Sequence, residues 1–565
     1  MPSPHLRLHC LSSLRCHVNS APKSKLPTLP KIPSKYRSLA IRQAQKALAD
    51  YLHTTRALPF AYADYISKNS HYSLSGIISK VHFSAPTFSR SVQKFLMYNP
   101  INEFEFFYES IGIGYREIDG FLKPNLFFFS EDSSPLNAAC ALAGFGFPWN
   151  KLGRLCKGEV SIFGKTPEFL ADRINGLKAA GFSNFPVIGI CLAFPFVLSG
   201  GSELSGEINR LLDDLKRVLI EFDLEGSIEG NAEAWYEVCG KIRVFYDLGV
   251  EKGEIGELMG RNRHIFLEHR KEVLVEKIEF FCRLGVSKEE VCLLLLETPE
   301  ILRIDLKNPT ISVLGFLKHF GMQEKMLKLI AQKYSYVLGM NKMANLPYIL
   351  RAMNLHEWAF DEIKKGGYQL LANYSLSSPD ESTHETYLES LEKIRCTKTP
   401  YHTISKLNFL HGIGFGENSF TIKLLANVHG TSSVLQERFD CLLHAGIEFS
   451  KLCKMISLSP KILNQDANIL RRKLNFLQEI GSSLQYLDVF PAYLLYDLER
   501  RIKPRYKFHV WLTEKGLCMK SYSIASMIAT SEKSFLARLA GIHPTALTQW
   551  LEHFAYKNQN RDSRE

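Results

Sequence analysis

Two clusters of basic side chains lie near the C-terminal end of the chain. The first consists of Arg471, Arg472 and Lys473, and the second of Arg500, Arg501, Lys503, Arg505 and Lys507. Clustered cations neutralise phosphate groups and release their bound counterions, and arginine adds a two-pronged geometry that matches a phosphate. We therefore predict that both clusters contact the phosphate backbone of a nucleic acid. The alternative is that they form solvated faces of helices.

Aromatic residues are interleaved with the second cluster, at Tyr506, Phe508 and Trp511. Such rings can stack on the bases of a single-stranded nucleic acid. They can equally form the apolar core between layers of helices, and this second interpretation is the one we prefer.

A third set of cations recurs eight residues before a regularly spaced glycine. Its members are Arg173, Lys241, Lys277, Arg438 and Lys473. If the repeats stack, these side chains form a line along one surface that could follow a phosphate backbone. Alternatively, their aliphatic stems cover the edge of the core and their charged ends pair with acids such as Asp172, Glu276 and Glu437.

The sequence offers no pattern of metal ligands or catalytic residues. Its twelve cysteines include no C-x-x-C pair, and Cys441 and His444 have ligand-like spacing without a second pair. H-E-x-x-H and G-x-S-x-G are also absent from the sequence. We expect no metal, no cofactor and no enzymatic activity.

The glycines that define this spacing belong to a repeat. They are Gly112, Gly146, Gly181, Gly249, Gly285, Gly321, Gly412, Gly446, Gly481 and Gly516. Most are 34 to 36 residues apart, while a gap of 68 residues holds one degenerate repeat and a gap of 91 holds at least one repeat and an insertion. A fixed period of this size indicates a solenoid, in which each unit buries its apolar face against its neighbours.

One unit is clearest in residues 275–302. Ile278, Phe281 and Leu284 form an apolar stripe on a first helix, and Gly285 ends it in the left-handed conformation. Ser287 begins a second helix, and Pro299 then opens a short third one. We predict an all-α solenoid of about 10–12 such repeats of ~35 residues, each built as helix, Gly turn, helix, Pro and short helix.

The L-G-h-S sequence at Leu284–Ser287 and the P-x-I-L endings at Pro299–Leu302 and Pro460–Leu463 resemble the mitochondrial transcription termination factor (mTERF) family, in its plant organellar branch. The resemblance covers roughly residues 91–517. Pentatricopeptide and tetratricopeptide arrays have similar periods, but neither ends its units in P-x-I-L. Some units depart from the pattern, because Arg263 and Ser335 occupy the Pro position and Asn354 stands near an expected Gly.

The N-terminal segment has the composition of an organellar transit peptide. No acidic residue precedes Asp50, whereas Arg7 and Arg15 flank a helical face made of Leu8, Leu11, Leu14 and Val18. This pattern favours a mitochondrial over a chloroplast destination, and a disordered basic tail is the alternative. We divide the chain into a transit peptide (1–37), a helical cap or linker (38–90), the repeats (91–520) and a C-terminal cap with a polar tail (521–565).

The net charge is concentrated at the two ends. The whole chain carries +11, residues 1–37 contribute +7 and residues 450–565 contribute +8, which leaves residues 38–449 at −4. The longest apolar stretch, residues 185–198, contains two prolines and is too short to span a bilayer. We expect a monomer without a membrane span.

The resemblance implies a protein that binds organellar double-stranded DNA and regulates organelle gene expression, for example by terminating or pausing transcription. Binding of RNA in intron splicing or RNA processing is an alternative. A second alternative is a helical scaffold that binds organellar proteins without nucleic-acid contact, which the acidic balance of residues 38–449 favours.

Overall fold

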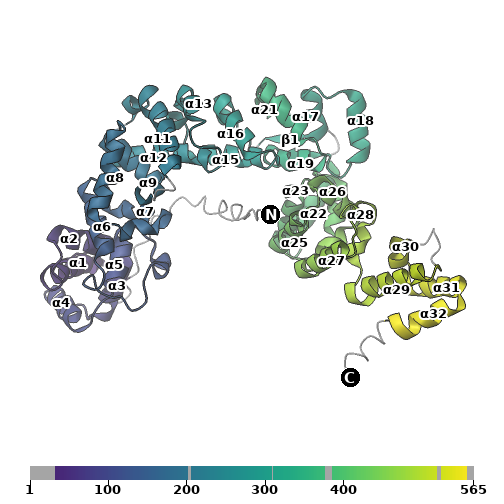
Figure 1. The fold of residues 1–565 in the computed structure, drawn as a ribbon, viewed down its shortest axis with the longest axis horizontal. Helices are drawn as coiled ribbons and strands as arrows, with labels where there is room; N and C mark the ends of the chain where they lie inside the picture. The colour runs from purple at the N-terminus through teal and green to yellow at the C-terminus, as the bar shows by residue number, and fades with distance from the viewer. Residues whose placement is uncertain are drawn as a thin grey trace. The chain divides into compact units, whose positions relative to one another are not determined.

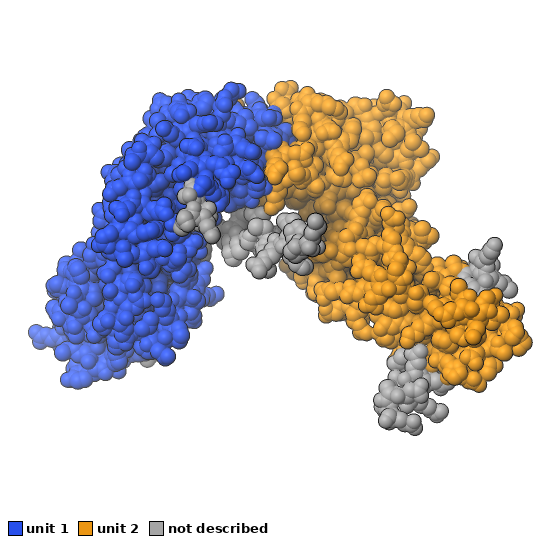
Figure 2. Space-filling view, viewed as in Figure 1, with its two compact units in different colours: residues 1–276, 292–302 blue, residues 277–291, 303–565 orange. Residues whose placement is uncertain are grey.

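The computed structural model describes residues 29, 32–200, 205–228, 230–307, 309–375, 385–517 and 523–555. These residues are mostly helical, and they divide into two compact units, coloured separately in Figure 2. Unit 1 contains residues 1–276 and 292–302, and unit 2 contains residues 277–291 and 303–565. The predicted all-α repeat architecture is confirmed.

The helices that lie wholly in unit 1 follow one another closely along the chain (Figure 1). They are α1 (Arg37–Thr54), α2 (Phe60–Asn69), α3 (His71–Lys80), α4 (Phe88–Tyr98), α5 (Glu103–Ser110), α6 (Ser134–Gly144), α7 (Leu152–Gly158), α8 (Pro167–Ala179), α9 (Asn184–Ala193), α10 (Phe196–Ser199), α11 (Ser205–Lys216), α12 (Ala232–Tyr246), α13 (Gly256–Arg261) and α14 (His264–Glu268).

Two helices, α15 (Lys271–Cys282) and α16 (Lys288–Glu297), contribute residues to both units. The helices that lie wholly in unit 2 are α17 (Val313–His319), α18 (Glu324–Lys333), α19 (Leu346–Ala352), α20 (His356–Glu362), α21 (Tyr368–Ser375), α22 (Glu385–Arg395), α23 (Pro400–Gly412), α24 (Ser419–Leu425), α25 (Ser432–His444), α26 (Phe449–Leu458), α27 (Ala467–Glu479), α28 (Tyr486–Val489), α29 (Lys503–Glu514), α30 (Ile524–Ala529), α31 (Glu532–Ile542) and α32 (Pro544–Gln549).

A small two-stranded ladder in unit 2 is the one sheet among the described residues. Strands β1 (Thr310–Ser312) and β2 (Met340–Lys342) pair antiparallel. The sequence did not predict them, because three residues are too few to show an alternating pattern.

The landmark glycines behave as turn residues, with one correction. Nine of the ten predicted glycines have positive φ, but Gly412 lies inside α23 and Gly414, with φ 95°, makes the turn instead. Asn354 (φ 57°) fills the position where a glycine was expected, which is tolerable because asparagine visits this region more readily than most residues. These eleven positions agree with the predicted number of repeats.

The short third helices form where the prolines predict them. Pro299, Pro460 and Pro491 each begin a 3-10 helix, namely η8 (Pro299–Arg303), η12 (Pro460–Asn464) and η13 (Pro491–Leu495). The unit with Arg263 at the Pro position still forms its short helix, α14. The capping box at Ser287 is also present, since Glu290 N donates to Ser287 Oγ at 3.2 Å.

The N-terminal region is more helical than its composition indicates. Residues 38–90, predicted as a helical cap or linker, contain most of α1, which starts at Arg37, all of α2 and α3, and the start of α4. The carboxylate of buried Glu109 accepts hydrogen bonds from the backbone N–H groups of Tyr72 (2.6 Å) and Ser73 (2.9 Å) at the start of α3. This cap comes from a distant residue, so the local sequence could not reveal it.

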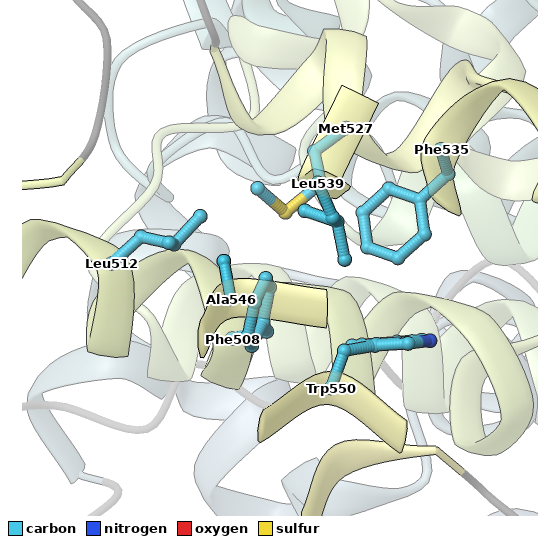
Figure 3. Close-up of a cluster of buried hydrophobic side chains, with 7 residues drawn as sticks. All are labelled: Phe508, Leu512, Met527, Phe535, Leu539, Ala546 and Trp550. Atoms are coloured by element: carbon cyan, nitrogen blue, oxygen red, sulfur yellow. The ribbon is translucent and has the colours of Figure 1, made fainter. Parts of the chain in front are cut away.

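The C-terminal region forms a packed lobe in unit 2. Figure 3 shows its buried cluster, to which α29, α30, α31, α32 and the π-helical turn η15 (Trp550–Phe554) contribute: Phe508, Leu512, Met527, Phe535, Leu539, Ala546 and Trp550. Residues of the range 523–555 therefore contribute to a helical core. The predicted polar tail from 557 onward lies outside the described residues, as do nearly all of the predicted transit peptide and residues 376–384 of the predicted insertion.

Candidate nucleic-acid interface

The predicted cation forms the same contact in all five repeats that carry it. Its side chain donates to a backbone carbonyl 21 to 27 residues later, at the short third helix of the repeat or just after it. The pairs are Arg173 with Gly200, Lys241 with Phe266 (2.8 Å), Lys277 with Ile304, Arg438 with Leu463 (2.7 Å) and Lys473 with Leu494 (2.8 Å). We call this contact the carbonyl clasp.

A sixth clasp was missed by the sequence analysis. Lys406 Nζ donates to the carbonyl of Val428 at 3.1 Å. Lys406 lies eight residues before Gly414, so the regular spacing would have found it had Gly414 been taken as the landmark instead of Gly412. The clasp has a simple physical basis, because the last carbonyls of a helix lack partners within it and attract a cation.

Burial decides the role of the lysines in this row. Lys241, Lys277 and Lys473 are 5%, 4% and 1% exposed. A buried ammonium group has no access to a phosphate, so the predicted phosphate-contacting line is incorrect for these three residues. Arg173 and Arg438 are half-buried and already hold carbonyls. Burial also lowers the pKa of Lys473 to about 8.

The second basic cluster also contains both buried and exposed cations. Arg505 is 1% exposed, donates to the carbonyls of Met527 (2.7 Å) and Thr530 (2.6 Å), and pairs with Glu532 at 2.5 Å. Half-buried Arg501 donates to the carbonyls of Ile528 (2.8 Å) and Thr530 (2.7 Å). Both residues fasten α29 and the preceding turn to the end of α30, and Arg505 must be removed from the predicted phosphate contacts.

The aromatic residues of this region belong to the core. Phe508 is fully buried, Trp511 stacks on it with ring centroids 5.4 Å apart, and Tyr506 meets Phe476 edge-on at 5.8 Å. This agrees with the packing interpretation and leaves these rings poorly placed to stack on bases.

The remaining cations form an exposed group that we call the C-terminal basic patch. Its members are Arg471, Arg472, Arg500, Lys503 and Lys507, of which Lys503 is half-buried and the others are exposed. They lie on α27, on the π-helical turn η14 (Leu498–Ile502) and on α29. One carboxylate joins these elements, because Glu499 pairs with Arg472 at 2.6 Å and with Lys503 at 2.8 Å.

Three acids lie on the same turns, namely Glu499, Asp466 and Asp497, so the five cations leave a surplus of positive charge at an accessible surface. Asp466 caps α27 through Asn468 N (2.9 Å), and Asp497 caps η14 through Arg500 N (2.6 Å). These caps fix the helical turns from which Arg471, Arg472 and Arg500 project. Such a surface can bind phosphates by charge and by hydrogen bonds from guanidinium groups.

Other kinds of site are not supported by the geometry. Across the described ranges, no group of three or more His, Cys, Asp or Glu side chains is arranged to hold a metal ion. Within the same ranges, no single helix is long and apolar enough to cross a membrane. Helices α8 and α9 together have the length and composition of a span, but the chain bends by 117° between them.

Comparison with known proteins identifies the family. The mTERF family model matches residues 231–356 and 399–536. Over 534 residues, the chain is 53% identical to the mitochondrial transcription termination factor MTEF18 of Arabidopsis thaliana, covering 94% of this chain and 96% of that protein. The chain belongs to the mTERF family.

A second mTERF relative is more distant. The chloroplastic transcription termination factor MTERF8 of Arabidopsis thaliana is 31% identical over 105 residues, which is 18% of this chain and 21% of that protein. Membership of the mTERF family and the similarity to MTEF18 support a role in the regulation of organelle gene expression. The C-terminal basic patch lies within the second matched range.

Proposed function

We propose that this mTERF protein acts in mitochondria by binding double-stranded DNA through the C-terminal basic patch, and thereby terminates or regulates transcription. The observation that carries the proposal is the separation of the cations into two groups. Buried cations hold the repeats together, whereas Arg471, Arg472, Arg500, Lys503 and Lys507 reach the surface and outnumber the acids there, Glu499, Asp466 and Asp497.

The mechanism is occupancy of the nucleic acid and requires no catalytic group. Cations held on helices neutralise phosphates at fixed positions, so binding releases counterions and its strength falls with salt. A protein bound in this way obstructs or recruits the transcription machinery. We expect the protein to act as a monomer and without a cofactor.

The test measures binding of the full chain to matched double-stranded DNA, single-stranded DNA and RNA across a salt series. The variant R471Q/R472Q/K507Q should bind duplex DNA more weakly, and its plot of log affinity against log salt should be less steep by about 0.9 for each phosphate that is no longer neutralised. The control variant K80Q/R90Q/K94Q removes three exposed cations from α3 and α4 of unit 1 and should bind like the parent chain.

The other outcomes separate the alternatives. Tighter binding to RNA than to duplex DNA would favour a role in splicing or RNA processing. An equal decrease of affinity in both variants would mean that only net charge matters, and the patch would be rejected. Absence of binding to all three at low salt would favour a protein-binding scaffold.

A further inference from the structure

Helix α18 buries far less of its surface than other second helices of the repeats. It spans ten residues, of which Ile330 is the one that is fully buried. In α26, a second helix of the same length, the five residues Phe449, Leu452, Cys453, Met455 and Ile456 are buried. Figure 1 shows α18 at the rim of unit 2, beside α17.

The exposed surface of α18 has an apolar stripe. Met326 is 47% exposed and Leu329 is 53% exposed. They are three residues apart, so they lie on the same face of the helix. Packing within unit 2 leaves this stripe uncovered.

Lysines surround the stripe. Lys325 and Lys328 each precede one of its apolar residues, Lys333 follows Leu329 by one turn, and Lys318 lies at the end of α17. All four are exposed, and no carboxylate of the described part of the chain lies within ion-pair distance of them. The segment 313–334 has four lysines and one acid, although residues 38–449 together carry −4.

We propose that α18 is the docking site for an acidic amphipathic segment of a partner protein. Its apolar residues would cover Met326 and Leu329, and its carboxylates would face Lys325, Lys328 and Lys333. Methionine is favoured in the apolar core of such interfaces, whereas charged groups occupy the rim. The inference is independent of the nucleic-acid proposal, since it rests on a different surface.

Charge and apolar area together favour a protein over other partners. A phosphate backbone would pair with the lysines but would gain nothing from burying Met326 and Leu329. A lipid surface would need a larger apolar face than two exposed side chains on a ten-residue helix provide. An acidic amphipathic segment matches both features of the surface.

The test uses a defined probe and the full chain. A fluorescently labelled helical peptide carries leucines along one face and glutamates elsewhere, and a scrambled peptide of the same composition is the reference. We expect the amphipathic peptide to bind more tightly than the scrambled one. The variant M326Q/L329Q should weaken its binding by about tenfold or more, because two apolar side chains no longer pack against the peptide, and K325E/K328E should also weaken it.

The matched control is L458Q/V489Q, which replaces two exposed apolar residues of α26 and α28 and should bind the peptide like the parent chain. Equal binding of both peptides, or equal binding by M326Q/L329Q and the parent chain, would overturn the proposal. It would also be overturned if K325E/K328E left peptide binding unchanged and weakened binding to duplex DNA or to vesicles of anionic lipid.

Discussion

Lys473 Nζ lies 2.8 Å from the carbonyl oxygen of Leu494, and this bond ties the first helix of a repeat to its short third helix. Five further repeats have the same interaction, from Arg173, Lys241, Lys277, Lys406 and Arg438. Lysine and arginine suit this position because their side chains are long enough to reach from one helix to the next and carry the N–H donors that a carbonyl needs.

Replacing Lys473 by methionine should destabilise unit 2. The substitution keeps the length of the side chain but leaves the Leu494 carbonyl without its donor, which should cost about 1–3 kcal/mol. Urea unfolding followed by circular dichroism measures this. Arg471→Gln, an exposed change two residues away, is the control and should leave the midpoint almost unchanged. An unchanged midpoint for K473M would show that the clasp does not stabilise the repeat.

The stabilising effect of Lys473 should increase between about pH 8 and pH 10.5. Burial lowers the pKa of Lys473 from its ordinary value of 10.5 to about 8, although the charge of Asp497 opposes this. In that pH range the unfolded chain holds a proton that the folded chain has released, so the free energy of unfolding rises with pH. Below pH 8 both states are protonated and the slope disappears.

This pH dependence is measured as a difference between two proteins. The melting temperatures of the parent chain and of K473M are compared at pH 7.5 and pH 9.5, so that other titrating groups cancel. The difference in melting temperature between the parent chain and K473M should be larger at pH 9.5 than at pH 7.5. A constant or narrowing gap would mean that Lys473 does not titrate in this range.

Alanine substitutions should distinguish Gly414 from Gly412. Gly414 has φ 95°, and an added Cβ would lie 2.7 Å from the Tyr348 carbonyl oxygen and 2.9 Å from Ala352 Cβ. Gly412 lies in α23, where an added Cβ meets nothing within 4 Å. We expect G414A to lower the melting temperature strongly and G412A to leave it unchanged or raise it slightly. Similar effects for both would refute the reassigned turn.

Removing the charge of Glu499 should strengthen nucleic-acid binding, if the C-terminal basic patch is the binding surface. Glu499 pairs with both Arg472 and Lys503, so E499Q leaves both cations available and removes a repulsive charge. We expect an increase in affinity of about threefold to tenfold at low salt that declines as salt is raised. E514Q, at the exposed end of α29, is the control with the same charge change. An equal gain in nucleic-acid affinity for E499Q and E514Q would place the binding surface elsewhere.

The sequence by itself determined the repeat. Its period, the glycines that end first helices and the prolines that open short third helices follow from local backbone preferences, so they are visible without a structure. The same is true of the family resemblance, which rests on those positions. The number and bounds of the helices in residues 60–98 were not visible in the sequence, because a distant cap such as Glu109 on α3 helps to fix them.

Only the tertiary structure decided which cations are available. Lys473 and Arg472 are neighbours in sequence and carry the same charge, yet one holds a buried carbonyl and the other is exposed beside Glu499. Adjacent residues on a helix point in directions about 100° apart, so burial depends on what packs against each face. Spacing revealed a recurring position within the repeat, whereas the structure showed that this position serves the core and that the neighbouring surface is the candidate interface.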